Sequence, residues 1–358
     1  SWIMPQSVMV HSFSEVPRAE IPRSSFNRSH GYKTAFDADY LIPVLCDDVV
    51  PGDTFNVNMS FFARLATPLF PIMDNMHLES FFFFVPYRLV WDNWRKMHGE
   101  QDNPADSIDF TVPVSANFTL SVGDLGDYFG LPLRVTNTSG NISCLPFRAY
   151  RLIWNEWFRD QNLQNSVTVN TGNGPDAVAD TGINVDPLKR GKRHDYFTSC
   201  LPWPQKGDAV SLPLGSQAEV YTDAADNATV GVRSTQGGTV WRALDMPGTH
   251  LQLDDTTIAS DGLIADLTNA TAATINDLRL AFQTQRLLER DARGGTRYNE
   301  LILAHFGVTV PDFRIQRPEF LGGGSSPVNV TPVAQTSGQP TPAQNDQLGH
   351  LSAFGTVS

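Results

Sequence analysis

The stretch Met76-His-Leu-Glu-Ser-Phe-Phe-Phe-Phe-Val85 decides the fold class of this chain. It begins with apolar residues that alternate with polar ones, and it ends in an unbroken apolar run. Alternation with a period of two is typical of a half-buried strand, and a short continuous apolar run is typical of a strand covered on both faces. The run is far shorter than the roughly 20 apolar residues that span a membrane. The stretch therefore predicts a buried β-strand.

Two other segments repeat this alternation. Asp53-Thr-Phe-Asn-Val-Asn-Met-Ser-Phe61 predicts a half-buried strand, and the residues from Ile108 to Val122 predict one long strand or two joined by a bend. The 27 Gly and 24 Pro interrupt the chain too often for long helices. In a helix interior a Gly costs about 1 kcal/mol and a Pro costs about 3 kcal/mol relative to Ala. The sequence therefore predicts a mainly β fold of short antiparallel strands, in which Gly322 to Ser326 forms a loop.

Four segments carry apolar residues at helical spacing, and we expect them in the connections between strands. They are residues 88–98, 147–158, 274–293 and 296–307. Thr274 and Asp277 form a capping-box pattern at the start of the third segment, and Gly294 follows its end. Four tryptophans lie on the first two segments, at positions where core packing is expected and an inter-subunit contact is the alternative: Trp91, Trp94, Trp154 and Trp157.

The charge and cysteine content exclude several classes of protein. The chain has 26 Lys and Arg against 38 Asp and Glu, a net charge of −12 that repels phosphate, so general coating of nucleic acid is excluded. Cys46, Cys144 and Cys200 are far apart and lack C-x-x-C spacing, which argues against a disulfide framework and a zinc site and favours a reducing compartment. The sequence shows neither a membrane-spanning run nor a secretory signal.

Catalytic patterns are also missing from the sequence. There is no G-x-S-x-G, no H-E-x-x-H and no P-loop, and the acidic pairs Asp37 with Asp39 and Asp254 with Asp255 lack EF-hand spacing. We therefore predict no catalytic residue, no cofactor and no metal ligand, and we expect that the protein is not an enzyme.

A series of phrases in a fixed order gives the chain a family resemblance. They are Ile21-Pro-Arg-Ser-Ser-Phe-Asn-Arg-Ser-His-Gly-Tyr-Lys-Thr-Ala-Phe-Asp37, Leu41-Ile-Pro43, Pro51-Gly-Asp-Thr-Phe55, Phe62-Ala-Arg-Leu-Ala-Thr-Pro68, Pro71-Ile-Met-Asp-Asn75 and Phe82-Phe-Phe-Val-Pro-Tyr-Arg-Leu-Val-Trp-Asp-Asn-Trp94. Together they closely resemble the major capsid protein of the gokushovirus branch of the Microviridae, small bacteriophages with single-stranded DNA. The match is dense over the first hundred residues and returns at 146–157 and 279–324. The resemblance implies a viral jelly roll, eight antiparallel strands in two sheets with long helical and irregular insertions, that builds a small T=1 icosahedral shell.

The resemblance and the composition together divide the chain into four parts. Residues 1–34 form an extended N-terminal arm that we expect to reach a neighbouring subunit through Arg18, Arg23 and Arg28. Residues 35–205 form the first part of the jelly-roll core. Residues 206–273 form a surface insertion that matches the threefold protrusion of the family, thought to touch the host, with a solvated loop as the alternative. Residues 274–358 contain helices and the jelly-roll continuation, and because relatives extend past the position of Phe354, we expect this part to be truncated.

The sequence contains one basic run, which consists of Lys189, Arg190, Lys192 and Arg193. Facing the inside of a shell, such a run would neutralise phosphates of the single-stranded DNA genome. A salt-bridged subunit interface and an exposed loop are the alternatives.

The resemblance also implies a small basic DNA-packing protein, a pilot protein and a host surface receptor as partners, no membrane, and a virion assembled in the cytoplasm of a bacterial host.

Two other functions compete with a structural capsid subunit. The first is a jelly-roll carbohydrate-binding protein, because aromatic-rich acidic sandwiches can bind sugars through stacked rings. The second is a glycoside hydrolase, which needs two carboxylates about 5 Å or about 6.5 to 9.5 Å apart. No pair of acidic residues in the sequence stands out for that role.

Overall fold

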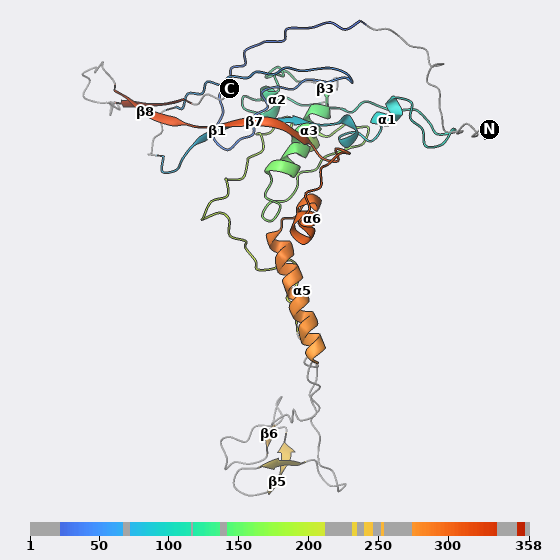
Figure 1. Cartoon of the computed structure of the whole chain (residues 1–358), viewed down its shortest axis with the longest axis vertical. Coiled ribbons are helices and arrows are strands. Elements are labelled where there is room, and N and C mark those ends of the chain that lie inside the picture. The colour runs from blue at the N-terminus through green and yellow to red at the C-terminus, as the bar shows by residue number, and fades with distance from the viewer. Residues whose placement is uncertain are drawn as a thin grey trace, which may run out of the picture.

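The fold is known from a computed structural model (Figure 1). The structure describes residues 22–66, 72–115, 117–136, 142–211, 231–234, 240–245, 252–253, 274–334 and 349–354. Nine strands lie in these ranges: β1 (His77–Phe84), β2 (Val114–Ser115), β3 (Ile142–Ser143), β4 (Gly231–Ser234), β5 (Val240–Asp245), β6 (Gln252–Leu253), β7 (Glu319–Pro327), β8 (Asn329–Ala334) and β9 (Gly349–Phe354). They pair antiparallel in four sheets, namely β1-β7, β2-β3, β4-β5-β6 and β8-β9. Antiparallel pairing of this kind is consistent with the predicted mainly β class.

The strand predicted from the opening stretch is confirmed as β1. It pairs with β7 along its whole length, from His77 opposite Pro327 to Phe84 opposite Glu319, with an irregularity between Phe82 and Phe83. Val85 follows the strand, and Pro86 then begins the turn that leads into the next helical segment.

Six α-helices lie in the described ranges: α1 (Trp94–Met97), α2 (Leu125–Tyr128), α3 (Leu145–Ile153), α4 (Val178–Thr181), α5 (Ile275–Arg293) and α6 (Tyr298–Phe306). A π-helical turn, Trp154–Phe158, extends α3, so the helix predicted over 147–158 is confirmed. The predicted capping box of α5 is present, with Asp277 N donating to Thr274 Oγ1 at 3.1 Å and Thr274 N donating to Asp277 Oδ2 at 3.1 Å. The helix predicted over 88–98 is interrupted, because only a 3₁₀ turn, Tyr87–Leu89, and α1 form there.

Three sequence predictions are wrong. Residues 53–61 form no strand, because no other described segment pairs with their backbone, and Phe55 and Val57 stay exposed. Of the one or two strands predicted between Ile108 and Val122, the described residues form only β2 and an isolated β-bridge at Phe118, and Phe118 and Leu120 are buried in the core. The loop predicted at 322–326 is instead part of β7.

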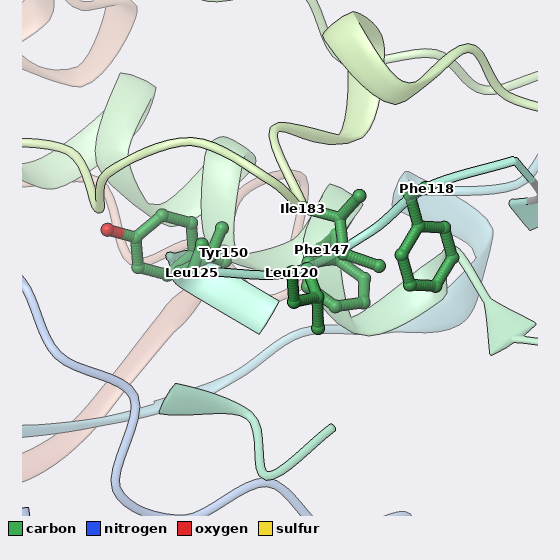
Figure 2. Packing of buried hydrophobic residues seen from close by; sticks show 6 residues of the cluster. All are labelled: Phe118, Leu120, Leu125, Phe147, Tyr150 and Ile183. Carbon is green, nitrogen blue, oxygen red and sulfur yellow. The ribbon is translucent and has the colours of Figure 1, made fainter. Parts of the chain in front are cut away.

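The main hydrophobic core lies between α2, α3 and the segment that carries Ile183. Figure 2 shows its six buried residues, Phe118, Leu120, Leu125, Phe147, Tyr150 and Ile183. The Tyr150 hydroxyl donates to Leu41 O at 2.9 Å and accepts a hydrogen bond from Leu188 N at 2.8 Å, so the core also fixes two connecting segments. A second cluster contains Val90, Trp91 and Leu145.

Core packing is confirmed for two of the four tryptophans, because Trp91 and Trp154 are buried. Trp94 is half-buried and packs against the cluster of Val90, Trp91 and Leu145. Trp157 is 37% exposed, and an inter-subunit contact of its ring stays a prediction.

A buried ion pair joins the two clusters. Arg148 on α3 donates from Nε to Asp176 Oδ2 at 2.7 Å and from Nη2 to Asp176 Oδ1 at 2.6 Å. Its Nη1 donates to the carbonyl oxygens of Val90 and Gly172 at 2.8 and 2.9 Å. Both side chains are 1% exposed, so the charges are matched where water is excluded.

Helices α5 and α6 stand away from the β1-β7 sheet in Figure 1. None of the described helices combines the length and the apolar character needed to cross a bilayer.

Candidate assembly and nucleic-acid surfaces

The predicted basic run, residues 189–193, contacts strand β1 through its side chains. The backbone of the run is held by other segments of the chain. Tyr40 and Lys189 form an antiparallel bridge, and Arg190 N donates to Asp39 O at 2.8 Å. Trp154 Nε1 donates to Lys189 O at 2.8 Å, which ties the run to the end of α3. The run therefore has a fixed place in the fold.

Two of its arginines converge on one carboxylate. Arg190 and Arg193 both form ion pairs with Glu79 of β1, whose side chain is 11% exposed. The Arg190 guanidinium also lies 5.2 Å from the centre of the Phe81 ring, and Arg193 Nη2 donates to Ser325 Oγ on β7 at 2.8 Å. These contacts attach the run to both strands of the β1-β7 sheet.

The two lysines of the run also have partners in the chain. Lys192 Nζ lies 3.1 Å from Asp74 Oδ2 and 2.8 Å from Asp195 Oδ2. Hydrogen bonding to Lys192 lowers the pKa of both carboxyl groups, and the two carboxylates raise the pKa of Lys192. Lys189 Nζ lies 5.1 Å from the centre of the Tyr40 ring. The four cations are therefore brought together, but acidic or aromatic groups of the same chain contact each of them.

A rigid turn that the sequence reasoning missed follows the run. The Asp195 carboxylate accepts hydrogen bonds from Phe197 N and Thr198 N, each at 2.9 Å. The turn leaves Tyr196 93% and Phe197 84% exposed, with ring centres 5.5 Å apart and planes at 90°. The available signal was Asp195, because Asp side chains form turns by accepting a hydrogen bond from the backbone two residues further on.

The N-terminal arm is described from residue 22 onward, so Arg18 lies outside the described residues. Arg23 donates to Gly52 O, and Arg28 forms an ion pair with Asp47. The structure thus places both arginines against a segment of their own chain. The predicted contact of the arm with a neighbouring subunit stays a prediction.

Many large apolar side chains are exposed on the described residues. The most exposed are Phe26, Phe62, Met73, Tyr196, Phe197, Phe306 and Phe313, each at least 78% accessible. Where such side chains lie together they mark surfaces that bind partners. By contrast, the described residues contain no group of three or more His, Cys, Asp or Glu that could hold a metal ion.

Comparison with known proteins identifies the family. Residues 14–358 match the family of the capsid protein (F protein). The chain belongs to this capsid protein family. Its predicted resemblance to the gokushovirus-like Microviridae is confirmed by curated relatives from that group.

Three relatives in this capsid protein family cover almost the whole chain. Capsid protein VP1 of Bdellovibrio phage phiMH2K is 46% identical over 97% of the chain and 66% of its own length. Capsid protein VP1 of Chlamydia phage 1 is 38% identical over 97% of the chain and 69% of its own length. Capsid protein VP1 of Spiroplasma virus 4 is 37% identical over 96% of the chain and 66% of its own length. The chain thus spans about two thirds of the length of these relatives.

Proposed function

We propose that this chain is the structural subunit of a small T=1 icosahedral phage shell that encloses a single-stranded DNA genome. The observation that carries the proposal is the match of residues 14–358 to the capsid protein family. The exposed apolar side chains support it, because a shell subunit covers such surfaces only by packing against copies of itself. In this proposal the chain is a component of the virion.

The jelly roll is part of this proposal. The described sheets contain two or three strands each, and an isolated two-stranded ladder is marginally stable in water. Further pairing along β1 and β7 would complete an eight-stranded sandwich and cover the open edges of both strands. The antiparallel register of β1 with β7 is compatible with that arrangement.

The surface insertion, residues 206–273, and the N-terminal arm, residues 1–34, supply contacts to molecules outside the subunit. Residues 206–273 contain nine acidic and three basic residues, a composition that favours an exposed segment, and we place the contact with the host surface there. The arm supplies contacts to a neighbouring subunit, supported by Phe26, which is 80% exposed. A small basic DNA-packing protein and a pilot protein complete the proposed particle.

Contact of Lys189, Arg190, Lys192 and Arg193 with the genome is a separate proposal. The exposed rings of Tyr196 and Phe197 support it, because bases of single-stranded DNA stack on such side chains beside cations. Glu79, Asp74 and Asp195 oppose it, because phosphate must compete with them for the cations. Replacing Tyr196 and Phe197 by Ala should lower the DNA content of purified particles; unchanged content would exclude stacking on these rings.

Electron microscopy of the purified full-length protein tests the function. We expect closed particles of uniform diameter with icosahedral symmetry. A stable monomer at high protein concentration would contradict the proposal. Binding of such monomers to a glycan array, without higher assembly, would favour the carbohydrate-binding alternative.

A further inference from the structure

Helices α5 and α6 form a hairpin whose two arms are locked together. The helices approach closely where α5 ends, because a Cβ atom added at Gly294 would overlap the Cβ of Ala304. His305 on α6 contacts the Asp291 carboxylate on α5 through Nε2. These contacts hold α6 against the last turn of α5.

The outer faces of the hairpin carry exposed apolar side chains. Helix α6 is mostly apolar, with Asn299, Glu300 and His305 as its strongly polar residues, yet none of its residues is buried. A helix with that much apolar surface normally packs against a protein core. We define the hairpin surface by its six most exposed large aliphatic and phenylalanine side chains: Ile275, Leu280, Phe282, Leu287, Leu303 and Phe306, which are 50% to 78% exposed.

The apolar residues of α5 lie on more than one side of the helix. Ile275, Leu278 and Phe282 follow each other at i, i+3 and i+7, so they share one face. Leu280 and Leu287 are seven residues apart and share a second face. The contacts that α5 makes with α6 leave both faces accessible. Covering them requires a partner that reaches round the helix or more than one partner.

The charges on α5 indicate the chemistry of the partner. Arg279, Arg286 and Arg290 lie at i, i+7 and i+11, which places them along one stripe of the helix. A partner that covers the neighbouring apolar faces must offer acidic groups to this stripe. The chain itself has that character, since its net charge is −12 and its segment 206–273 has a threefold excess of acidic over basic residues.

We propose that the hairpin surface is an interface with a second copy of this chain. The inference rests on the proposed shell function, which supplies identical neighbours at fixed positions around each subunit. Phe282 on α5 and Phe306 on α6 are the exposed phenylalanines of the hairpin surface and its expected apolar anchors. The arginine stripe faces acidic groups of the neighbouring copy and fixes its orientation.

Thiol labelling tests the interface without disturbing the fold. Cys46 and Cys200 are exposed, whereas Cys144 is buried, so Cys46→Ser and Cys200→Ser give a background without exposed thiols. In this background Phe282→Cys and Phe306→Cys are made in the full-length protein, and maleimide labelling is compared between particles of the purified chain and dissociated subunits. We expect labelling to slow at least tenfold in particles. Equal rates in the two states would overturn the interface, although the shell function would stand.

A charge substitution gives the second measurement. Phe282→Glu places a carboxylate in the interface, and Gln316→Glu is the control, because it adds the same charge at an exposed polar position outside the hairpin surface and the arginine stripe. We expect at least a tenfold lower particle yield for Phe282→Glu, with unfolding midpoints of the dissociated subunits equal to wild type. Wild-type particle yield for Phe282→Glu would contradict the inference. Absence of particles in the wild-type protein would contradict the proposed function itself.

Discussion

Arg148 and Asp176 show how one charged pair holds the interior of this subunit. The guanidinium binds the carboxylate through two hydrogen bonds and reaches two backbone carbonyls, and Asn170 Nδ2 donates to Asp176 Oδ1 at 2.7 Å. The pair connects α3 to the segments that carry Val90 and Gly172. Asp176 N also donates to Val114 O at 3.0 Å, which attaches strand β2 to the same site.

Loss of one partner of this pair should strongly destabilise the subunit. Arg148→Met leaves the Asp176 carboxylate buried without its counter-charge, and breaking a buried pair in this way costs about 3–5 kcal/mol. We expect that decrease in the free energy of unfolding of dissociated subunits, measured by urea denaturation. Arg95→Met is the control, because the Arg95–Glu100 pair is largely exposed and such pairs contribute about 0–1 kcal/mol. Equal losses for the two variants would contradict the structural role of the buried pair.

Cys144 lies beside this pair and should be chemically inert. Burial and the nearby Asp176 carboxylate raise the pKa of its thiol to about 12, and the thiolate is the reactive form of cysteine. At pH 8 we expect a maleimide to modify exposed Cys200 fastest. We expect slower modification of Cys46, because burial and the nearby Asp48 and Asp47 raise the pKa of its thiol, and no modification of Cys144 in folded subunits. Mass spectrometry of digested protein measures this, and modification of Cys144 as fast as Cys46 would contradict the packing described.

Lys192 and Asp195 should be coupled through their protonation. Hydrogen bonding from Lys192 lowers the pKa of Asp195 below its ordinary value of 3.8. A lowered pKa in the folded state means that the pair stabilises the turn above about pH 4, and that this stabilisation is lost as the pH falls through the folded value. Carbon-13 NMR titration of the Asp195 carboxyl should show this pKa, and Lys192→Ala should raise it. An unchanged value in Lys192→Ala would exclude the coupling.

At the scale of elements, the β1-β7 ladder joins the basic run to the end of α3. The ring of Phe81 lies 5.1 Å from that of Phe158, and the ring of Phe83 lies 5.6 Å from that of Trp157. Trp157 Nε1 donates to Pro318 O at 2.9 Å, immediately before β7. The same face of β1 carries Glu79, so aromatic packing and ion pairs act on one side of the strand.

The three consecutive glycines of β7 are not equivalent. A Cβ atom added at Gly323 would overlap the carbonyl oxygen of Ser80, whereas one added at Gly322 meets nothing within 4 Å. Gly323→Ala should therefore destabilise dissociated subunits by about 1–3 kcal/mol, as overpacking does. Gly322→Ala should be neutral or stabilise slightly, because alanine restricts the unfolded chain. Urea denaturation of the two variants measures the difference, and equal stability would contradict the close approach of β1 and β7.

Local sequence signals predicted the elements that depend on local chemistry. The capping box and apolar spacing of α5 and the apolar run of β1 contain most of the information that determines those elements. The alternation at 53–61 did not become a strand, because a strand also needs a paired neighbour that no local pattern specifies. The glycines of β7 resemble a loop in sequence, and only their contact with Ser80 explains them.

The candidate sites also divide into features that local sequence predicts and features that depend on contacts between distant residues. The basic run was visible in the sequence, but its neutralising partner Glu79 lies on a strand more than 100 residues earlier. The buried Arg148–Asp176 pair was missed, because neither residue belongs to a recognisable motif. Exposure of Tyr196 and Phe197 depends on the hydrogen bonds of Asp195, which composition does not reveal.

At the scale of the whole molecule, the distribution of apolar surface is the dominant feature. The subunit has two compact clusters near α3, while large apolar side chains remain exposed on the arm, on the hairpin and on the turn after the basic run. In a protein that worked alone in solution, these side chains would stay exposed to water. Relative to burial, that exposure costs about 25 cal/mol for each Å² of apolar surface. In the proposed shell, identical neighbours would cover these groups and remove that cost.

Cryo-electron microscopy of particles formed by the full-length protein tests this account most directly. We predict an icosahedral reconstruction in which adjacent subunits cover the outer faces of α5 and α6. A reconstruction in which those helices face solvent, or a protein that stays monomeric at every concentration reached, would contradict it.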